Sequence, residues 1–214
     1  DELINYELGV KSQLAGGRAS LQAAVFRIVW EDMQVQSLDV QSGIPFITNA
    51  GESEINGLEM NLDARINDNL DFQLGLTLIN AELTEDQPFT DEGEDRGFDG
   101  DSIPNIPDVQ GFAALTYTTD LSVGELSLRG DLTYRGEADT RFDTASPFNR
   151  ELDAYSLVNL RASLRLSSDL ELTVYGKNVT DARAEFDAIA SVQDPLAVVG
   201  ARPRTLGFSI RKDF

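Results

Sequence analysis

Apolar side chains recur at every second position along almost the entire chain, and this alternation restricts the possible folds more than any other feature. In one clear example, Phe72, Leu74 and Leu76 alternate with Asp71 and Gln73. A period of two is typical of a β-strand with one apolar face, whereas a helix needs a period of about 3.6. We therefore predict an all-β, antiparallel meander of about nine long strands. These strands cover residues 3–14, 18–40, 45–66, 70–84, 108–121, 125–138, 153–166, 170–178 and 203–214.

Two of these segments are predicted to carry local irregularities. In 18–40 the apolar positions move by one residue between "LQAAV" and "FRIVW", and a β-bulge would restore the register. In 45–66, Asn49, Ala50, Gly51 and Gly57 permit a bulge or a close approach of two strands. Plain strand geometry is the alternative explanation for these four residues.

The connections between the segments alternate between two kinds. Tight turns of Gly, Asn, Asp and Ser are predicted at 15–17, 67–69, 122–124 and 167–169. The connections between them are a short one near Ser42 and Gly43 and long ones at about 85–107, 139–152 and 179–202. Short turns at one end and long loops at the other are typical of a transmembrane β-barrel. The carboxyl terminus is then predicted at the short-turn, periplasmic end.

A soluble β-sandwich shows the same alternation and has to be weighed against the barrel. Several segments are longer than the usual globular strand of about five or six residues. Their polar faces carry charged residues of both signs, as a hydrated lumen would. Aromatic residues also lie towards the strand ends, where membrane girdles are found: Phe72, Tyr117, Tyr134, Tyr155 and Phe214. These features favour the barrel.

Composition excludes several classes of function. The chain has no cysteine and no histidine, which removes disulfide scaffolds, zinc sites of the Cys/His kind, thiol nucleophiles and histidine-based triads. Its 37 acidic and 17 basic residues argue against binding to nucleic acid, which needs a basic face. No apolar run approaches the roughly 20 residues of a membrane-spanning helix, which excludes a helical membrane protein. We expect no enzyme activity and no cofactor.

Charged side chains on the polar faces are the candidate binding residues. The predicted lumen-facing set is Glu59, Asp63, Arg65, Arg129, Asp131, Arg135, Arg161 and Arg165. Four of the arginines, at 129, 135, 161 and 165, could guide an anionic ligand through a lumen. The alternative is a structural role, in which they pair with Asp131, Glu59 and Asp63, or with a plug.

The stretch "EDQPFTDEGEDRGFDGD" at 85–101 is the most charged part of the chain. Asp95, Asp99 and Asp101 offer oxygen ligands that would suit calcium. Their spacing does not fit an EF-hand, and a solvated acidic loop is the alternative. A metal site here is therefore only a weak candidate.

The last segment ends the chain on a strict alternation of apolar residues that closes on Phe214. Leu206, Phe208, Ile210 and Phe214 are predicted to face lipid, although alternation alone requires no terminal aromatic residue. Five stretches carry a resemblance to a known family: "NYELGVKS" (5–12), "NAGESEINGLEMNLDARI" (49–66), "IPNIPDVQGFAALTY" (103–117), "VYGKNVTDARAE" (174–185) and "ARPRTLGFSIRKDF" (201–214). Taken in this order, they resemble the C-terminal part of the barrel of TonB-dependent outer-membrane receptors.

The resemblance implies a function and a set of partners. It implies that Leu206, Phe208, Ile210 and Phe214 form the signal read by the barrel assembly machinery, although Lys212 departs from the usual apolar residue. It implies that residues 1–214 are one segment of a barrel of about 22 strands, without the plug, the TonB box and the earlier strands. The whole receptor would lie in the Gram-negative outer membrane, in contact with its lipid. It would take up a scarce nutrient, such as a ferric siderophore, a corrinoid or a carbohydrate, energised by the TonB complex through the plug.

Two alternatives from other classes remain open at this stage. One is a small, complete porin-like or structural barrel, which should have an even number of strands. The other is a soluble β-sandwich that acts as a binding module. The chain begins "DELINYELGV", in which no signal peptide is visible, so we expect a cytosolic protein or a mature or truncated segment.

Overall fold

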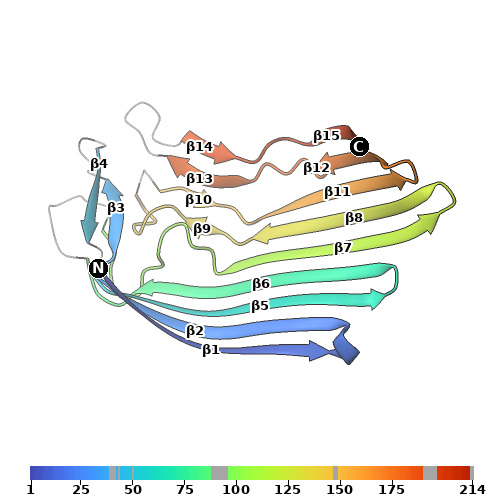
Figure 1. The fold of residues 1–214 in the computed structure, drawn as a ribbon. Helices are drawn as coiled ribbons and strands as arrows, with labels where there is room; N and C mark the ends of the chain where they lie inside the picture. Colours follow the sequence, from blue (N-terminus) through green and yellow to red (C-terminus); the bar gives the residue numbers. More distant parts are fainter. Residues whose placement is uncertain are drawn as a thin grey trace.

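The computed structural model describes residues 1–38, 42, 44–49, 51–87, 96–146, 149–189 and 197–212. Among these residues, nine long strands form one antiparallel sheet in the order β1-β2-β5-β6-β7-β8-β11-β12-β15 (Figure 1). The strands are β1 (Glu2–Leu14), β2 (Ala19–Glu31), β5 (Ser53–Asn67), β6 (Leu70–Leu83), β7 (Val109–Leu121), β8 (Gly124–Arg135), β11 (Tyr155–Leu166), β12 (Leu170–Lys177) and β15 (Thr205–Lys212). The predicted meander of nine strands is confirmed. In the described part of the chain, no helix is long and apolar enough to cross a membrane.

The two ends of the sheet differ, as the turn composition predicted. At one end, which we call the turn end, the strands are joined by the 3₁₀ turn Ala15–Gly17 and by residues 68–69, 122–123 and 167–169. At the opposite loop end, the connections are 32–52, 84–108, 136–154 and 178–204. Three of them contain small two-stranded sheets: β3 (Gln34–Leu38) with β4 (Pro45–Asn49), β9 (Ala138–Asp139) with β10 (Glu151–Leu152), and β13 (Glu185–Ile189) with β14 (Ala197–Gly200).

The short connection predicted near Ser42 and Gly43 joins β3 to β4, but the prediction that it directly joins two strands of the main sheet is wrong. Ser42 lies between β3 and β4 in a connection of the long kind. Segments 18–40 and 45–66 each combine a long strand of the main sheet with one strand of this hairpin. The apolar residues of this hairpin do not alternate strictly, since Phe46 and Ile47 are adjacent, and the sequence analysis did not use this change to end the long strands.

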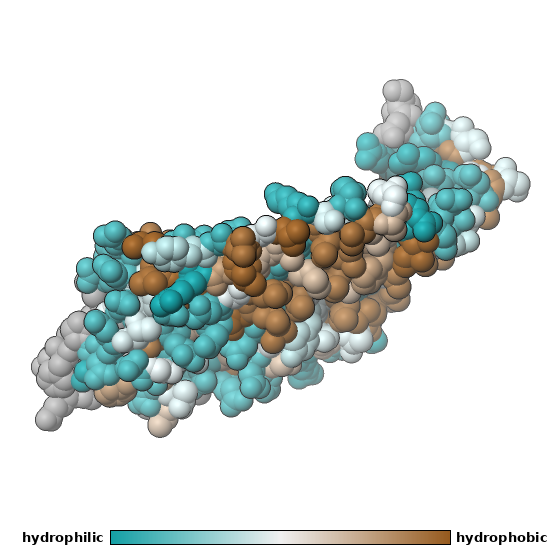
Figure 2. All heavy atoms as spheres, turned by 90° about the horizontal axis from the view of Figure 1, so that it is seen from below, coloured by the Kyte–Doolittle hydropathy of each residue, from teal (hydrophilic) through white to brown (hydrophobic). Residues whose placement is uncertain are grey.

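The pleat of the sheet separates apolar from polar side chains. Leu58 lies opposite Val25 on β2 and Leu78 on β6, and the same row continues to Val109 on β7. We call the face that carries this row the outer face and the opposite one the inner face. Outer-face side chains are strongly exposed, as at Leu8, which is 76% exposed. Figure 2 shows the hydrophobic residues gathered across the middle of the molecule, with hydrophilic residues towards both ends.

The bulge predicted in 18–40 does not form. Strand β2 pairs residue by residue with both neighbours, from Ala19 to Trp30, without a shift of register. Phe26, Ile28 and Trp30 instead lie on the inner face, whereas Val29 stays on the outer face with Val25. On the inner face, Phe26 covers Gly57 and Trp30 packs against a buried cluster beneath the loops. The apolar pattern changes face because the inner face is covered at the loop end, so a regular strand accounts for it.

Buried apolar side chains gather at the loop end of the inner face. We call this cluster the loop core, and it consists of Met33, Ala81, Leu83, Ile103 and Phe142. Leu83 is only 1% exposed. The cluster draws one residue from each of the connections 32–52, 84–108 and 136–154, together with two residues of β6. Burial of these side chains holds three connections against the sheet.

The packing at Gly57 can be tested by substitution. A Cβ atom at Gly57 would lie 2.6 Å from the Cε1 atom of Phe26, so Gly57→Ala should displace the ring. We expect this substitution to lower the free energy of unfolding by about 1–3 kcal/mol, as overpacking does. The measurement is a urea unfolding curve of the purified full-length protein in detergent.

Gly9→Ala is the matched control, because a Cβ there meets the Ala23 carbonyl oxygen at an ordinary 3.5 Å. Gly9 lies on the same inner face, opposite Ala24. Equal unfolding midpoints for the two variants would contradict a close approach of Phe26 and Gly57.

Candidate functional site

All eight residues of the predicted lumen-facing set lie on the inner face. The register fixes this placement, because Asp63 lies opposite Gln73, Arg129 lies opposite Arg161, and each alternates with outer-face residues. The strands that lie between these residues also carry polar side chains on the inner face. Two of the eight, Glu59 and Arg161, make no hydrogen bond or ion pair with any residue that the structure describes.

A chain of hydrogen bonds crosses the inner face from β5 to β8. The side-chain amide of Gln73 donates to Oδ1 of Asp63 at 3.1 Å. Arg129 Nη1 donates to Oε1 of the same glutamine at 3.1 Å and to the Thr116 hydroxyl at 3.0 Å. The half-buried Arg129 therefore connects β6 and β7 to its own strand, and Gln73 extends the chain to β5. The sequence analysis did not select Gln73 or Thr116, although both occupy inner-face positions of the alternating pattern.

The same network continues from β8 to β15. Arg129 Nε lies 3.8 Å from Oδ1 of Asp131, one of the partners expected from the sequence. Asn159 donates to Asp131 at 2.7 Å and accepts from the backbone N–H of Asn178 at 2.9 Å. The Asn178 side chain in turn donates to the carbonyl of Arg202 at 3.0 Å. The polar inner face is therefore linked to the chain that enters β15.

Two further arginines pair with acidic residues that the sequence analysis did not select as partners. Arg65 Nε lies 3.6 Å from Asp71, and Arg165 Nη2 lies 3.6 Å from Glu171. For Arg165, the expected pairing with Asp131, Glu59 or Asp63 is not the one that forms, and no pairing was predicted for Arg65. In each case the acidic partner is the residue directly opposite in the register. Cross-strand neighbours are the closest available side chains.

Arg135 does not pair with a carboxylate but bridges two loops. Its Nη2 donates to the carbonyl of Asn105 at 2.8 Å, and its Nη1 donates to the carbonyl of Phe186 at 3.3 Å. The connections 84–108 and 178–204 are thereby tied to the end of β8. This contact corrects the sequence-based interpretation of Arg135, which considered only carboxylates, a plug or an anionic ligand as partners.

Tyr155 belongs to the same contact region and not to an outer aromatic girdle. It lies opposite Arg135 in the register, so its side chain is on the inner face. Its ring packs against Phe186, with ring centroids 5.5 Å apart. Phe72, Tyr117 and Tyr134 lie on the outer face, as the alternation predicted. Phe214 lies outside the described residues.

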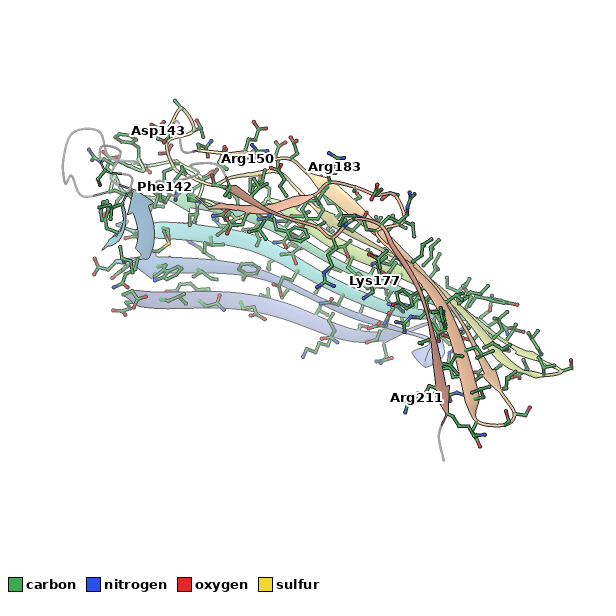
Figure 3. The ribbon with its side chains drawn as sticks, turned by 90° about the horizontal axis from the view of Figure 1, so that it is seen from above. Phe142, Asp143, Arg150, Lys177, Arg183 and Arg211 are labelled. Atoms are coloured by element: carbon green, nitrogen blue, oxygen red, sulfur yellow. The ribbon has the colours of Figure 1, made fainter. Side chains whose placement is uncertain are left out.

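A bidentate ion pair joins two of the loops directly. Arg150 Nε and Nη2 donate to the two carboxylate oxygens of Glu185, each at 2.6 Å (Figure 3). These hydrogen bonds lower the pKa of the Glu185 carboxyl and raise the pKa of the Arg150 guanidinium. We call this pair the loop clasp, because it fastens connection 136–154 to β13. Together with Arg135, it holds three connections in one assembly.

The acidic loop provides no metal site among the residues that the structure describes. Asp101 accepts a hydrogen bond from the N–H of Phe98 at 2.7 Å, and the N–H of Asp99 donates to Asp86 at 3.0 Å. No group of three acidic side chains converges there within the described ranges. Asp95 lies outside those ranges. The described aspartates make hydrogen bonds with backbone N–H groups of the loop. Calcium binding stays a prediction.

The outer face of the last strand is apolar. Leu206, Phe208 and Ile210 are 75%, 76% and 63% exposed, and they lie opposite Gly176, Val174 and Leu172. Phe214, the remaining residue of the predicted assembly signal, is not among the described residues. Reading of these side chains by an assembly machinery stays a prediction.

An apolar outer face, a polar inner face, short turns and folded long loops together define a wall segment of a transmembrane β-barrel. In such a wall the outer face contacts lipid and the inner face lines the lumen. The chain belongs to the family described as "TonB dependent receptor-like, beta-barrel", which matches residues 2–179. Its location is accordingly the outer membrane of a Gram-negative bacterium.

Individual relatives agree with the family. The chain is 28% identical over 196 residues to the "Probable TonB-dependent siderophore receptor PiuA" of Acinetobacter baumannii, covering 89% of this chain and 24% of that protein. It is 24% identical over 220 residues to the pesticin receptor of Yersinia enterocolitica, covering 100% of this chain and 29% of that receptor.

Solved structures share the fold. The ferric yersiniabactin uptake receptor FyuA of Yersinia pestis matches with a TM-score of 0.79 and 21% identity, over 99% of this chain and 30% of that one. The crystal structure of PiuA matches with a TM-score of 0.74 and 21% identity, over 97% of this chain and 28% of that one. The chain thus spans less than a third of the length of each of these relatives.

The loop clasp can be tested by its dependence on pH. Because the folded-state pKa of Glu185 is lowered, the clasp contributes stability above the ordinary glutamate pKa and loses it as the pH falls through the lowered value. We expect hydrogen exchange in 185–188, corrected for intrinsic rates, to accelerate between roughly pH 6 and roughly pH 3. The measurement is hydrogen–deuterium exchange with mass spectrometry on the full-length protein.

Glu185→Gln is the control for this pH dependence, since it cannot titrate. It should show fast exchange at both pH values. An acid-induced step that persists in Glu185→Gln would assign the effect to another group.

The hydrogen bonds of Arg135 to the two loops can be tested by substitution. Arg135→Gln should increase hydrogen exchange at 103–106 and at 185–188 by about tenfold, because it removes charge-assisted hydrogen bonds to both loops. Arg161→Gln is the matched control, an inner-face arginine without a partner among the described residues. Loop exchange that responds equally to both substitutions would argue for a general effect of inner-face charge.

Proposed function

We propose that this chain is the C-terminal wall of a plugged outer-membrane receptor that imports a ferric siderophore. The observation that carries the proposal is the likeness over 89% of the chain to a relative named as a probable TonB-dependent siderophore receptor. The fold likeness to the ferric yersiniabactin uptake receptor supports the same cargo class. The relatives named above support this cargo rather than the corrinoid or carbohydrate considered from the sequence.

The remainder of the receptor is part of the proposal. The chain covers 24% to 30% of the relatives' lengths, and the sheet of described strands leaves β1 and β15 with one neighbour each. A barrel needs both edges paired. We expect further strands to close a barrel of about 22 strands around a plug, and the TonB complex to act on that plug.

The loops and the inner face have separate tasks in this proposal. The connections held together by the loop core, the loop clasp and Arg135 would contribute to the extracellular surface that first meets the cargo. The polar inner face would line the space around the plug, with Glu59 and Arg161 available to it. The four residues Leu206, Phe208, Ile210 and Phe214 would be read by the assembly machinery.

The two rival functions make different demands on the outer face. A soluble β-sandwich would have to cover Leu8, Phe208 and the other exposed apolar residues with a second sheet, and no second layer covers them in the described structure. A small porin would be a complete barrel close to 23.4 kDa. The relatives are receptors, which supports a transport role and not catalysis.

Prediction from the proposed function. An antibody against this segment should detect a single outer-membrane band. The mass of this band should be at least roughly three times 23.4 kDa. Deletion of the gene should abolish growth on one ferric siderophore as the sole iron source and spare growth on ferric citrate. A panel of siderophores, with cobalamin and maltodextrin as other cargo classes, identifies the substrate.

A membrane band at 23.4 kDa would overturn the proposed receptor in favour of a small barrel, and a cytosolic band would favour a soluble β protein. Loss of cobalamin or maltodextrin uptake, with siderophore uptake intact, would keep the receptor and change its cargo.

A further inference from the structure

The last strand, β15, has to find its register without a tight turn. Residues 167–169 join β11 directly to β12, whereas the long connection 178–204 separates β12 from β15. A tight turn fixes the register of the two strands that it joins, and a long connection does not. Among the described strands, β15 also has a single neighbour, β12. Its register therefore depends on contacts with β12 and with the connection.

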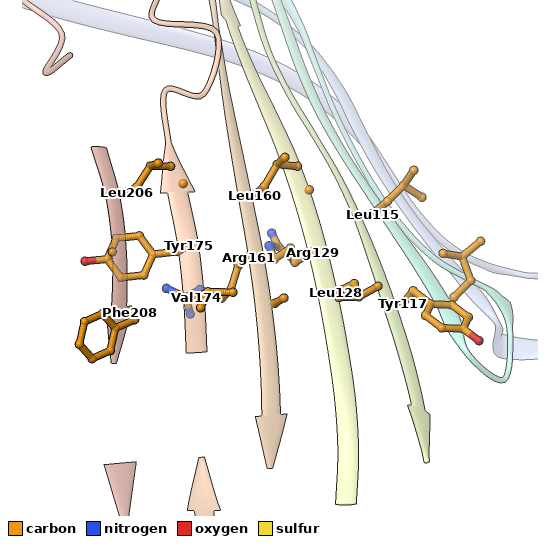
Figure 4. A pocket seen from close by; sticks show the side chains of 15 residues that line it. Leu115, Tyr117, Leu128, Arg129, Leu160, Arg161, Val174, Tyr175, Leu206 and Phe208 are labelled. Atoms are coloured by element: carbon orange, nitrogen blue, oxygen red, sulfur yellow. The ribbon is translucent and has the colours of Figure 1, made fainter. Parts of the chain in front are cut away.

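The alternation of side chains excludes some registers of β15 but not all of them. Apolar outer-face residues of the two strands lie directly opposite one another: Leu172 and Ile210, Val174 and Phe208, Gly176 and Leu206 (Figure 4). A slip of one residue would turn the apolar side chains of β15 towards the lumen. A slip of two residues would leave every side chain on its own face, with Val174 opposite Leu206 or Ile210. Another contact has to select between these registers.

Asn178 joins the two ends of the connection. It follows β12 directly and is only 5% exposed. Its Nδ2 donates to the carbonyl of Ala182 at 2.9 Å and to the carbonyl of Arg202, 24 residues along the chain, at 3.0 Å. Its backbone N–H donates to Oδ1 of Asn159 on β11 at 2.9 Å. The buried amide thus fixes the chain before β15 relative to β11 and β12.

Asp181 makes a second contact across the connection. Its Oδ1 accepts a hydrogen bond at 2.8 Å from the backbone N–H of Arg204, the residue directly before β15. Asn178 and Asp181 both adopt left-handed backbone, with φ values of 47° and 56°, and the N–H of Asp181 donates to the carbonyl of Asn178 at 2.9 Å. Asn and Asp are the non-glycine residues that adopt this conformation most readily. We call these two residues the register staple.

Tyr175 provides a further contact that depends on the register. It lies opposite Gly207 on the inner face, and a Cβ atom at Gly207 would lie 2.5 Å from its hydroxyl oxygen. The ring therefore occupies the space that a larger side chain at position 207 would need. A slip of two residues would bring Thr205 or Ser209 opposite the ring in place of the glycine. The close approach of ring and backbone is specific to the register that forms.

We infer that the register staple, supported by the Tyr175 ring, selects the register in which the C-terminal strand joins the sheet. The staple holds Arg202 and Arg204, so the strand begins with Thr205 opposite Lys177. In a closed barrel the stagger of the strands has to be consistent around the whole circumference. A shift of β15 would be passed to the strand that pairs with its other edge. The staple therefore acts in the closure of the barrel, independently of the cargo.

Disulfide trapping in the full-length receptor, assembled in the outer membrane, measures the register directly. The chain has no cysteine of its own. A disulfide forms between directly opposite positions, whereas diagonal positions are too far apart. Val174→Cys/Phe208→Cys reports the register of the structure, and Val174→Cys/Leu206→Cys and Val174→Cys/Ile210→Cys report slips of two residues in either direction. Mass spectrometry of proteolytic peptides identifies each disulfide, in protein that migrates in gels as folded and heat-modifiable.

The wild-type background should form the slipped disulfides only in traces. Asn178→Gly/Asp181→Gly keeps the left-handed turn and removes both staple contacts, so the slipped share should rise at least about tenfold. Adding Tyr175→Ala should raise the slipped share further. Asp181→Asn should behave like the wild type, because its amide oxygen can still accept from the Arg204 N–H.

Asp169→Gly is the matched control. Asp169 lies at the other end of β12 with a φ of 61°, and its side chain makes no hydrogen bond or ion pair with a residue that the structure describes. This variant should keep the wild-type pattern of disulfides. Asp181→Gly alone, which removes one staple contact, takes the place of the double variant should the latter not fold.

Two outcomes would overturn the inference. One is a wild-type pattern of disulfides in the variant that combines both staple substitutions with Tyr175→Ala. The other is an equal slipped share in this combined variant and in Tyr175→Ala alone, which would assign the choice of register to the ring.

Discussion

The unbroken antiparallel register from β1 to β15 is the constraint on which the rest of the structure depends. Strands alternate their side chains with a period of two, so a slip of one residue would exchange the outer and inner faces completely. In a membrane this exchange would place Arg129, Asp131 and Arg161 against lipid. Within the described main sheet, the register shifts only between Arg65 and Asn67, beside the 68–69 turn. An irregularity there leaves the membrane-spanning alternation intact.

The inner face is polar near one end of the strands and apolar near the other. The difference arises because loops cover only one of these two ends. Towards the turn end it is polar, and hydrogen bonds and an ion pair that run from Asp63 through Arg129 and Asp131 to Asn159 connect part of its groups. At the loop end it is apolar, and the loop core covers it. Buried polar groups need partners and exposed apolar groups need cover. The two halves of the same face meet these requirements with different side chains.

The sequence predicted the strands well because both signals were local. Alternation located each long strand, and Gly, Asn, Asp and Ser marked the tight turns. Three features escaped because they depend on contacts distant in sequence. Arg135 meets Asn105 and Phe186, which are 30 and 51 residues away. The ring contact of Tyr155 with Phe186 is also distant in sequence, although the alternation with Val158 and Leu160 alone places Tyr155 on the inner face. The apolar run from Phe26 to Trp30 made sense only once three loops were seen to cover it.

The contacts that hold the loop connections against the sheet differ in strength. This difference predicts which connection is displaced from the sheet most easily. Connections 32–52, 84–108 and 136–154 contribute buried side chains to the loop core, whereas 178–204 contributes none among the residues that the structure describes. That last connection is held by Arg135, the ring contact with Tyr155 and the loop clasp, whose two side chains are 36% and 28% exposed. Partly exposed ion pairs contribute little compared with burial of leucine and phenylalanine. The β13–β14 hairpin is therefore the easiest part of this assembly to displace.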